Sequence, residues 1–396
     1  MKLIKKIFKN LVLLLFLPFW HIQRFIPRNK NLWIFGSWSG KKYSDNSKFL
    51  FEYVNLHCSN IKAIWITKSD EVYKELKKTG RNVYYENSIK GIFSCFLAKY
   101  AFLSNGAFDV NPYFLNGCKE IWLWHGMPLK KIGYLDDSQL NCSKIKRFFL
   151  KVFKPFYQMN PYCTLTSADF FTDFLSKSFK LPYDKIWNTG LPRCDAFFSS
   201  IKDPYIEQLK CKYENSSIFI YMPTFRMSSS MTGSPFNPFI TEYGFYEKEF
   251  IDFLEKNNIL FLYKPHFVDR DVKVSINSDR FIFLDDSMFT DLYILLNSVD
   301  CLITDYSSVF FDFIATKKDI YLLPFDYEEY KIKSRGHFFN MYEEMNGIVS
   351  YSWRDFYNSV NSRNLINSDC NLNEKFIQYV DGFSCKKIVD KILNLG

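Results

Sequence analysis

Several short motifs place ionisable side chains directly after runs of apolar residues. The run Ile121–Trp124 leads into His125 and Gly126, and Lys130 follows shortly afterwards. An imidazole accepts protons near neutral pH, and a neighbouring glycine lets a ligand approach the backbone. The motif therefore indicates a general base. A histidine in such a place also serves to hydrogen-bond a loop, and the motif alone leaves both roles open.

Cationic groups follow two further apolar runs in the second half of the chain. Ile218–Met222 is followed closely by Arg226, and Ile259–Tyr263 by Lys264 and His266. A guanidinium offers a planar fork of donors to a phosphate, and the other two groups add positive charge. Each group alone is compatible with a surface salt bridge. Together, at strand ends, they indicate a phosphate site.

The segment from Asp300 to Phe313 joins a predicted buried strand to an apolar helix. At the junction lie Thr304, Asp305, Ser307 and Ser308. The first N–H groups of a helix have no partners within the helix and attract anions. An ordinary helix cap would use the same residue types. Beside Lys264 and His266, the segment favours a cradle for a diphosphate.

Residues after the last predicted strand, Ile320–Leu323, give weaker signals. Glu328 is a candidate for binding ribose hydroxyls, and Arg335 is a candidate addition to the phosphate site, although both types also occur in solvated loops. The chain has no G-x-G-x-x-G, Walker or H-E-x-x-H motif, so nothing supports nicotinamide or ATP chemistry. We expect no metal and no cofactor.

The elements that must position these groups are short apolar runs separated by ten or more residues, a pattern typical of parallel sheets covered on both faces. The first series is Leu32–Phe35, Ala63–Thr67, Val83–Tyr85, Phe102–Ser104 and Ile121–Trp124. The second is Ile218–Met222, Ile259–Tyr263, Phe281–Leu284, Cys301–Thr304 and Ile320–Leu323. Two series in 396 residues predict two α/β domains, with a seam in the polar stretch 199–217. Such sheets bind ligands outside the carboxyl ends of their strands, where the motifs lie.

The positive charge is concentrated at the N-terminus. The formal net charge is +9, and residues 1–30 contain seven Lys and Arg and no acid, so the remaining chain is nearly neutral. No basic domain face is recognisable, and we expect no nucleic-acid partner. The apolar run Leu11–Trp20 would rise about 15 Å as a helix, too short to span a bilayer. It predicts an uncleaved helix on an anionic membrane surface, with docking on the protein's own core as the alternative.

A second amphipathic segment covers residues 144–156. Its apolar stripe consists of Ile145, Phe148, Phe149, Val152, Phe153 and Phe156, and its other face carries Lys144, Lys146, Arg147, Lys151 and Lys154. The spacing fits a core face as well as a membrane face. The wholly basic polar side favours the membrane.

Composition narrows the class of protein further. Hydrophobic residues make up 47% and charged residues 23%, which excludes a disordered chain. The ten Cys include no C-x-x-C pair. This argues against a zinc ribbon or a disulfide scaffold, and favours reduced thiols in the cytosolic compartment.

Taken together, the motifs resemble the CDP-glycerol glycerophosphotransferase family, which comprises teichoic acid primases and polymerases and related capsule polymerases. The resemblance runs from about residue 31 to about residue 345. It rests on Phe35–Asn46, His125–Lys130, Pro223–Arg226, Lys264–His266, Thr304–Ser308 and Arg335–Gly336. Met127 is a departure, since the family usually has Thr there. Because His125 and Lys130 are retained, we expect altered packing rather than lost chemistry.

The resemblance implies a GT-B-type α/β fold, with two Rossmann-like domains whose parallel sheets face across a cleft. Residues 1–30 would be a membrane-surface segment, 31–205 the acceptor-binding domain and 206–373 the nucleotide-binding domain. Residues 374–396 would form a helix that crosses back to the first domain. The enzyme would be monotopic on the cytoplasmic face of the cell membrane, and its oligomeric state stays open.

The resemblance also implies a reaction. His125 would deprotonate a hydroxyl of a polyol-phosphate, glycan or lipid-linked acceptor, which attacks the β-phosphorus of CDP-glycerol or a similar CDP-alditol and releases CMP. The residues that would neutralise or bind the nucleotide are Arg226, Lys264, His266, Thr304, Asp305, Ser307, Ser308 and Arg335, with Glu328 on the ribose. Those that would serve the acceptor are Ser37, Lys41, Gly126 and Lys130.

Two other functions remain open at this point. One is a GT-B glycosyltransferase that uses a UDP- or GDP-sugar for a cell-surface polysaccharide. The other is a non-catalytic membrane-bound scaffold that retains the fold. The choice among alditol phosphates, between one added unit and a polymer, and between teichoic acid and capsule also stays open.

Overall fold

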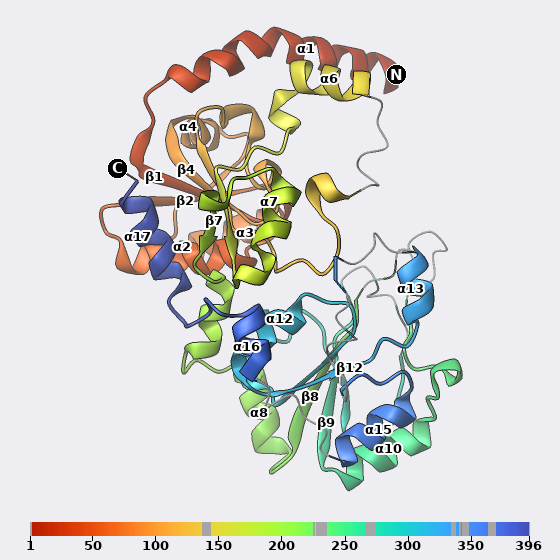
Figure 1. Cartoon of the computed structure of the whole chain (residues 1–396). Helices are drawn as coiled ribbons and strands as arrows, with labels where there is room; N and C mark the ends of the chain where they lie inside the picture. Colours follow the sequence, from red (N-terminus) through yellow and green to blue (C-terminus); the bar gives the residue numbers. More distant parts are fainter. Residues whose placement is uncertain are drawn as a thin grey trace. The chain divides into compact units, whose positions relative to one another are not determined.

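The chain folds into two compact α/β units (Figure 1). A computed structural model describes residues 2–136, 144–224, 226, 236–266, 269, 272, 274–333, 338–339, 342, 348–362 and 370–395. Unit 1 comprises Met1–His125, Ile132–Asp195 and Tyr379–Gly396, and unit 2 comprises Gly126–Lys131 and Ala196–Gln378. The chain thus changes units at residue 195, ten residues before the predicted boundary, and also directly after His125.

Unit 1 is built on a sheet of seven parallel strands in the order β3-β2-β1-β4-β5-β6-β7. Trp33, Ile34 and Phe35 are fully buried, because a parallel strand covered on both faces needs apolar side chains on both. The strands are β1 (Asn29–Gly36), β2 (Lys62–Thr67), β3 (Val83–Tyr85), β4 (Ala98–Leu103), β5 (Lys119–Trp122), β6 (Cys163–Thr166) and β7 (Ile186–Asn188). Five of them were predicted; β6 and β7 were not.

Helices of unit 1 precede, connect and follow these strands. They are α1 (Lys2–Ile22), α2 (Asp45–His57), α3 (Asp70–Lys78), α4 (Ile89–Leu97), α6 (Lys144–Phe153), α7 (Thr172–Phe179) and α17 (Ser384–Leu393). The C-terminal helix α17 packs on α2. The Asp195 carboxylate accepts the N–H groups of Ser384 and Cys385 at 2.9 Å each, which caps the start of α17.

The half-buried guanidinium of Arg28 helps to fasten the N-terminal segment to unit 1. Arg28 donates to the carbonyls of Cys95, Ala98, Phe114 and Asn116 at 2.7 to 3.2 Å. Helix α1 lies beside α6 (Figure 1). Among the described residues, no helix combines the length and the apolar character that crossing a bilayer requires.

Unit 2 contains a sheet of five parallel strands in the order β10-β9-β8-β11-β12. The strands are β8 (Ser217–Met222), β9 (Ile259–Tyr263), β10 (Phe281–Phe283), β11 (Cys301–Thr304) and β12 (Asp319–Leu322), all within one residue of the predicted bounds. The helices are α8 (Pro204–Lys212), α10 (Glu247–Lys256), α11 (Leu292–Ser298), α12 (Val309–Phe313), α13 (Tyr327–Lys333), α15 (Trp353–Asn361) and α16 (Cys370–Phe376).

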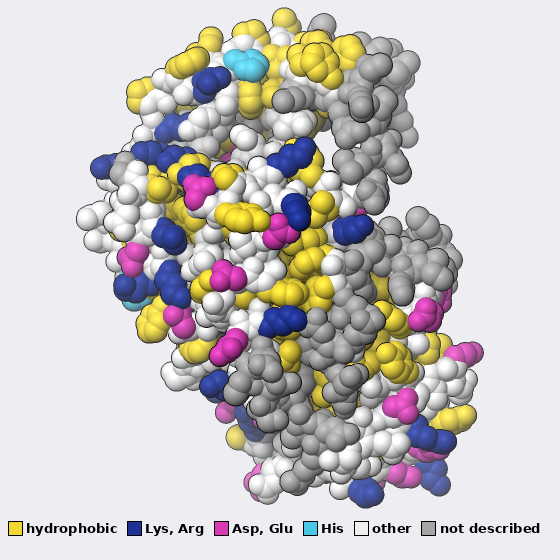
Figure 2. All heavy atoms as spheres, in the orientation of Figure 1, with side chains coloured by type: hydrophobic (Ala, Val, Ile, Leu, Met, Phe, Trp, Pro, Cys, Tyr) yellow, Lys and Arg dark blue, Asp and Glu magenta, His cyan; other side chains and the backbone are white. Residues whose placement is uncertain are grey.

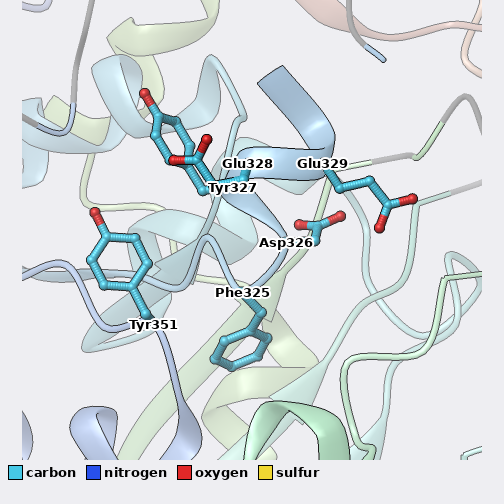
Figure 3. Close-up of a pocket in the computed structure, with 6 residues that line it drawn as sticks. All are labelled: Phe325, Asp326, Tyr327, Glu328, Glu329 and Tyr351. Atoms are coloured by element: carbon cyan, nitrogen blue, oxygen red, sulfur yellow. The ribbon is translucent and has the colours of Figure 1, made fainter. Parts of the chain in front are cut away.

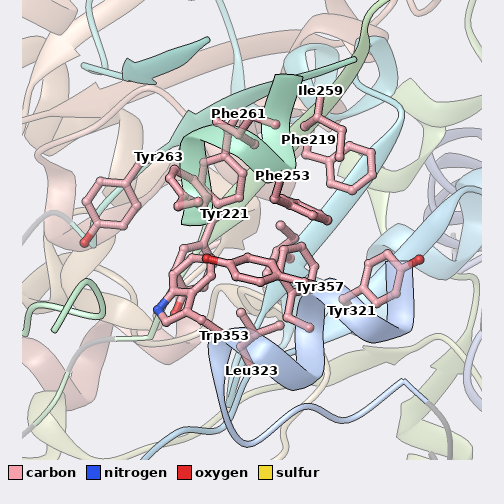
Figure 4. Packing of buried hydrophobic residues seen from close by; sticks show 14 of the residues in the cluster. Phe219, Tyr221, Phe253, Ile259, Phe261, Tyr263, Tyr321, Leu323, Trp353 and Tyr357 are labelled. Atoms are coloured by element: carbon pink, nitrogen blue, oxygen red, sulfur yellow. The ribbon is translucent and has the colours of Figure 1, made fainter. Parts of the chain in front are cut away.

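An aromatic core holds α10 and α15 against the sheet of unit 2. Figure 4 shows Trp353 and Tyr357 of α15 packed beneath Tyr221 and Phe261 of the central strands. The Trp353 indole N–H donates to the carbonyl of Pro238 at 2.8 Å, so its one polar atom is satisfied inside the core. This rigid core supports the strand ends that carry the predicted site.

Candidate functional site

The backbone delivers His125 from the carboxyl end of β5. Strand β5 ends at Trp122, but the N–H of Leu123 still donates to the carbonyl of Leu103 at 2.8 Å. Trp124 then adopts φ of 56°, a left-handed conformation that is rare for a tryptophan. The chain therefore turns sharply out of the sheet directly before His125.

One hydrogen bond fixes the proton on the His125 ring. Nδ1 lies 3.2 Å from the carbonyl oxygen of Ser104. Because a carbonyl only accepts, Nδ1 carries the proton and Nε2 keeps its lone pair. Burial lowers the pKa of His125 below its usual value, Arg193 lowers it further, and Asp45 opposes the shift. The ring is therefore neutral at pH 7 and able to accept a proton at Nε2.

Two indoles and an ion pair surround this imidazole. The ring centroids of Trp124 and Trp38 lie 4.3 Å and 5.9 Å from that of His125. The Trp38 indole N–H donates to the Asp45 carboxylate at 3.2 Å, and Arg193 forms a buried salt bridge with Asp45 at 2.8 Å. The ion pair thus holds one of the two indoles in place.

Sequence reasoning did not identify Asp45, Asn46 and Arg193 as site residues. Asp45 and Asn46 lie within the motif that carried the family resemblance, but no side-chain role was assigned to either. A usable signal was their position in that motif, shortly after the end of a predicted strand. Arg193 gave no such signal in the sequence, because its partner Asp45 lies 148 residues away.

The loop after β1 contains two predicted acceptor-side residues. Ser37 is fully buried, and its hydroxyl donates to the carbonyl of Lys42 at 2.7 Å. Its side chain therefore shapes the loop from inside instead of facing an acceptor. Lys41 is exposed.

A buried carboxylate braces the same loop. Asp109 accepts the N–H of Ser39 and the N–H of Asn105, each at 2.6 Å. Burial raises the pKa of Asp109 to about 7, although these backbone bonds oppose the shift. Trp38 and Ser39 both have positive φ, at 48° and 55°. Strained backbone of this kind is frequent at functional sites.

Arg226 of unit 2 lies in a cluster that differs from the predicted phosphate fork. Its guanidinium donates to Asp326 at 2.7 and 2.9 Å, to Asp305 at 2.8 Å and to the carbonyl of Thr224. The ring of Phe236 covers it at 4.0 Å. Burial opposes the charge of Arg226, but Asp305 and Asp326 outweigh burial and hold its pKa well above the usual value. In this structure the fork is directed at carboxylates.

The Arg226 cluster extends to Lys130 through two stacked rings. Tyr306 and Tyr330 stack with centroids 3.7 Å apart, and Arg226 lies 4.7 Å from the Tyr306 ring. Lys130 Nζ lies 4.9 Å from the centroid of Tyr330. The segment after His125 is thus part of unit 2, and its predicted Gly126 is buried with φ of 126°. The structure brings Lys130, Arg226 and Asp305 together.

The hydroxyl residues after β11 lie at the predicted junction, although the helix is short. Thr304 is buried, and its hydroxyl donates to the carbonyl of Met222 at 2.7 Å. Ser307 and Ser308 are half-buried before α12, which has only five residues. The carboxylate of Asp305 also accepts the N–H of Thr224, so it organises two strand-end loops.

The other predicted cations lie after β9. Lys264 Nζ forms a salt bridge with Asp286 at 2.6 Å, and its side chain is largely buried. His266 is half-buried, and its carbonyl accepts the N–H of Asp269 at 2.8 Å. Arg335 lies outside the described residues.

A pocket of about 350 Å³ opens at the carboxyl end of β12. Its lining residues are Phe325, Asp326, Tyr327, Glu328, Glu329 and Tyr351 (Figure 3). Glu328 is exposed, and Asp326 is shared with the Arg226 cluster. The pocket therefore combines aromatic surface with carboxylate acceptors, a lining that suits a ring bearing hydroxyl groups.

The fold and site define a class of two-unit α/β proteins whose polar chemistry lies at the carboxyl ends of parallel strands. The family described as CDP-Glycerol:Poly(glycerophosphate) glycerophosphotransferase matches residues 19–394, and the chain belongs to this family. It is therefore a transferase. The family predicted from the motifs and the α/β class with parallel sheets are both confirmed.

Relatives agree with this assignment. A teichoic acid glycerol-phosphate transferase of Staphylococcus aureus is 28% identical, over 81% of this chain and 81% of that protein. A teichoic acid poly(glycerol phosphate) polymerase of Bacillus spizizenii is 26% identical, over 98% of both. A solved His-to-Asn variant of the wall teichoic acid polymerase TagF with CDPG has a TM-score of 0.68 at 19% identity, covering 93% of this chain and 89% of that one. At that identity the last likeness shows the fold alone.

Proposed function

We propose that the protein transfers glycerol phosphate, or a related alditol phosphate, from a CDP-alcohol to an acceptor hydroxyl and releases CMP. The family description and the names of the relatives support this reaction. Teichoic acid is the favoured product, with capsular polysaccharide as an alternative destination. The acceptor would be a polyol phosphate, a glycan or a lipid-linked form of either.

The single observation that carries the mechanism is the contact between Nδ1 of His125 and the Ser104 carbonyl oxygen at 3.2 Å. The ring Nδ1–H is held by the Ser104 carbonyl, which leaves Nε2 as the acceptor of a proton. In the proposed step, Nε2 takes the proton of the acceptor hydroxyl as the oxygen attacks the β-phosphorus. The bond from that phosphorus to the bridging oxygen breaks, and CMP leaves with the electron pair.

Unit 2 would hold the CDP-alcohol. Phosphoryl transfer depends mainly on positioning and on neutralising developing charge. We assign the phosphate contacts to Lys264, His266, Ser307, Ser308 and Arg335, and the ribose to Glu328. Arg226 would act by ordering Asp305 and Asp326 beside this site, since its own donors already meet these carboxylates. Lys130 would bring a cation from the histidine motif to the same cluster.

The test is CMP release from CDP-glycerol by His125→Ala. General-base removal should slow turnover by about 10²- to 10⁴-fold with folding intact. His57→Ala is the matched control, because His57 is an exposed histidine at the end of α2. Turnover of His125→Ala within a few-fold of the parent protein would contradict the assignment. Parallel incubations with CDP-ribitol and UDP-sugars would separate this transferase from a glycosyltransferase.

We also propose that α1 and α6 bind the cytoplasmic membrane surface, which makes the enzyme monotopic. Leu15 of α1 is 76% exposed, Phe25 just beyond it 77% and Phe148 of α6 64%. Figure 2 shows hydrophobic side chains gathered along the α1 side of unit 1. The seven cations of residues 1–30 favour anionic headgroups.

Sedimentation with lipid vesicles tests this membrane proposal. The protein should bind vesicles that contain phosphatidylglycerol and bind neutral phosphatidylcholine vesicles much less, with binding weakened by salt. Phe148→Ser combined with Phe149→Ser should lower binding. Equal sedimentation of this double variant and the parent would exclude α6 from the contact.

A further inference from the structure

The backbone directly before His125 adopts a conformation that its own sequence disfavours. Trp124 has φ of 56°, and Asp45, which belongs to the surrounding network, has φ of 67°. An L residue with a bulky side chain occupies this region only where neighbouring groups stabilise it. The stabilising group must therefore be sought among the hydrogen bonds of the Trp124 peptide.

Asn46 supplies these bonds. Its side chain is fully buried, and its amide nitrogen donates to the carbonyls of Leu123 at 3.1 Å and Trp124 at 2.8 Å. Its amide oxygen accepts the backbone N–H of Arg193 at 3.1 Å. Two acceptors on one side and a donor on the other leave only one orientation of the amide.

The position of these bonds gives them a specific effect. The carbonyl of Trp124 belongs to the peptide bond that joins Trp124 to His125, so Asn46 fixes the plane from which the imidazole projects. The neighbouring Asp45 holds the Trp38 indole, which packs on the same ring. Asn46 lies in the first turn of α2, yet its side-chain contacts join other segments of unit 1 instead of capping the helix.

We infer that Asn46 is a positioning residue for the reaction, which sets the orientation of the His125 ring through the Trp124 peptide. The inference rests on the proposed role of His125 as general base. Without Asn46, the buried carbonyl of Leu123 and the half-buried carbonyl of Trp124 lose this donor, and the peptide is free to rotate. The ring then leaves the Ser104 carbonyl, and Nδ1 and Nε2 compete for the proton.

The experiment compares Asn46→Ala with Asn111→Ala. Asn111 is a matched control because it is also buried in unit 1 and its amide makes a similar set of bonds, to Glu86, Asn87 and Tyr113. Using CDP-glycerol and a lipid-linked glycerol phosphate acceptor, we expect Asn46→Ala to lower kcat by about 100-fold. The KM for CDP-glycerol should stay within about threefold, because nucleotide binding is untouched. Asn111→Ala should keep kcat within about twofold at a similar loss of thermal stability.

A second readout does not depend on turnover. Nitrogen NMR of protein labelled at its five histidines should show His125 with its proton on Nδ1, and Asn46→Ala should lose this preference. An unchanged His125 signal, or equal kcat for the two Ala variants, would overturn the inference.

If Asn46→Ala does not fold, Asn46→Ser keeps one hydroxyl donor and should lose about tenfold in kcat. Full turnover by His125→Ala would instead refute the role of His125 as general base. The NMR readout would still report whether Asn46 orients the His125 ring.

Discussion

The side chains of His125 in unit 1 and of Arg226 in unit 2 differ in how much of their hydrogen-bonding capacity the protein uses. His125 has one ring nitrogen bound to a carbonyl, and no partner for Nε2 is found among the residues that the structure describes. Arg226 instead donates to two carboxylates and a carbonyl and is covered by aromatic rings. The region around His125 leaves Nε2 available to accept a proton. The region around Arg226 uses its guanidinium to order its own loops.

Two buried acids of unit 1, Asp109 and Glu120, differ in the same sense from the two acids that bind Arg226. Asp305 and Asp326 of unit 2 share the guanidinium of Arg226. Asp109 and Glu120 of unit 1 accept N–H groups but form no salt bridge among the described residues, and burial raises the pKa of each to about 7. The comparison teaches that burial alone does not identify a reactive group; what matters is whether its bonding capacity is already used.

The largest predicted effect on stability comes from Arg226→Met. Removing the guanidinium leaves the buried carboxylate of Asp305 and the half-buried carboxylate of Asp326 without their cation, which should lower the free energy of unfolding by about 3–5 kcal/mol. Urea unfolding measures this loss. Arg81→Met is the control, because Arg81 pairs with Glu52 near the surface and should cost less than about 1 kcal/mol. Equal losses of unfolding free energy for both variants would mean that the Arg226 cluster contributes no more to stability than a surface ion pair.

A smaller, pH-dependent effect is predicted for Glu120→Gln. The pKa of Glu120 is about 7 in the folded state, above its ordinary value of 4.5, because burial disfavours the charge. Folding therefore favours the protonated acid, and stability falls as the pH rises from 4.5 to 7. Gln stays neutral and can still accept the Trp122 indole N–H. Glu120→Gln should be more stable than the parent by about 1–3 kcal/mol at pH 8 and equal to it at pH 4.5.

Melting temperatures at these two pH values measure the difference. A stabilisation of the same size at both values would mean that the ionisation of Glu120 does not cause it.

The pH profile of turnover sharpens the account of His125. A general base works in its neutral form, and burial lowers the pKa of His125 from its usual 6.5. The acid limb of kcat/KM should therefore have its midpoint below pH 6.5. Stopped assays of CMP release from pH 5 to 8 would locate it. A midpoint above 6.5 would show that the Asp45 carboxylate outweighs burial in solution.

The smallest effect is expected from Lys130→Met. Its ammonium lies 4.9 Å from the centroid of the buried Tyr330 ring, and a cation–π contact of this kind contributes about 0.5–2 kcal/mol. Unfolding of unit 2 by urea should shift by no more than that. A loss comparable to that of Arg226→Met would place Lys130 inside the ion cluster instead of at its edge.

Much of the fold could be predicted from the sequence, because buried parallel strands are continuous apolar runs. The strands of unit 2 were predicted within one residue, since each is a short apolar run that begins directly after a polar residue or one position later. Strands β6 and β7 escaped because Cys163–Thr166 alternates Thr with apolar residues and Ile186–Asn188 has only three residues. Short strands gain stability from the strands beside them, which a local pattern does not report.

The site was predictable as a set of positions and less so as a set of contacts. His125 and the residues after β11 lie at strand ends, as the sequence indicated. The partners of Arg226 did not follow, because Asp326 is 100 residues further along the chain and such pairings arise only from the fold. Asn46 was missed for the same reason: its bonds reach segments 77 to 147 residues away.

The four-carbonyl bond set of Arg28 bears on how shortened forms of this chain would behave when expressed. A truncation that starts at residue 23 removes α1 but keeps Arg28, and should yield a folded protein that sediments less with lipid because only α6 remains to bind it. A truncation that starts at residue 29 strips four carbonyls of their donor and should give little recoverable material, although only six more residues are missing. The safe cutting point therefore lies between the helix and the arginine.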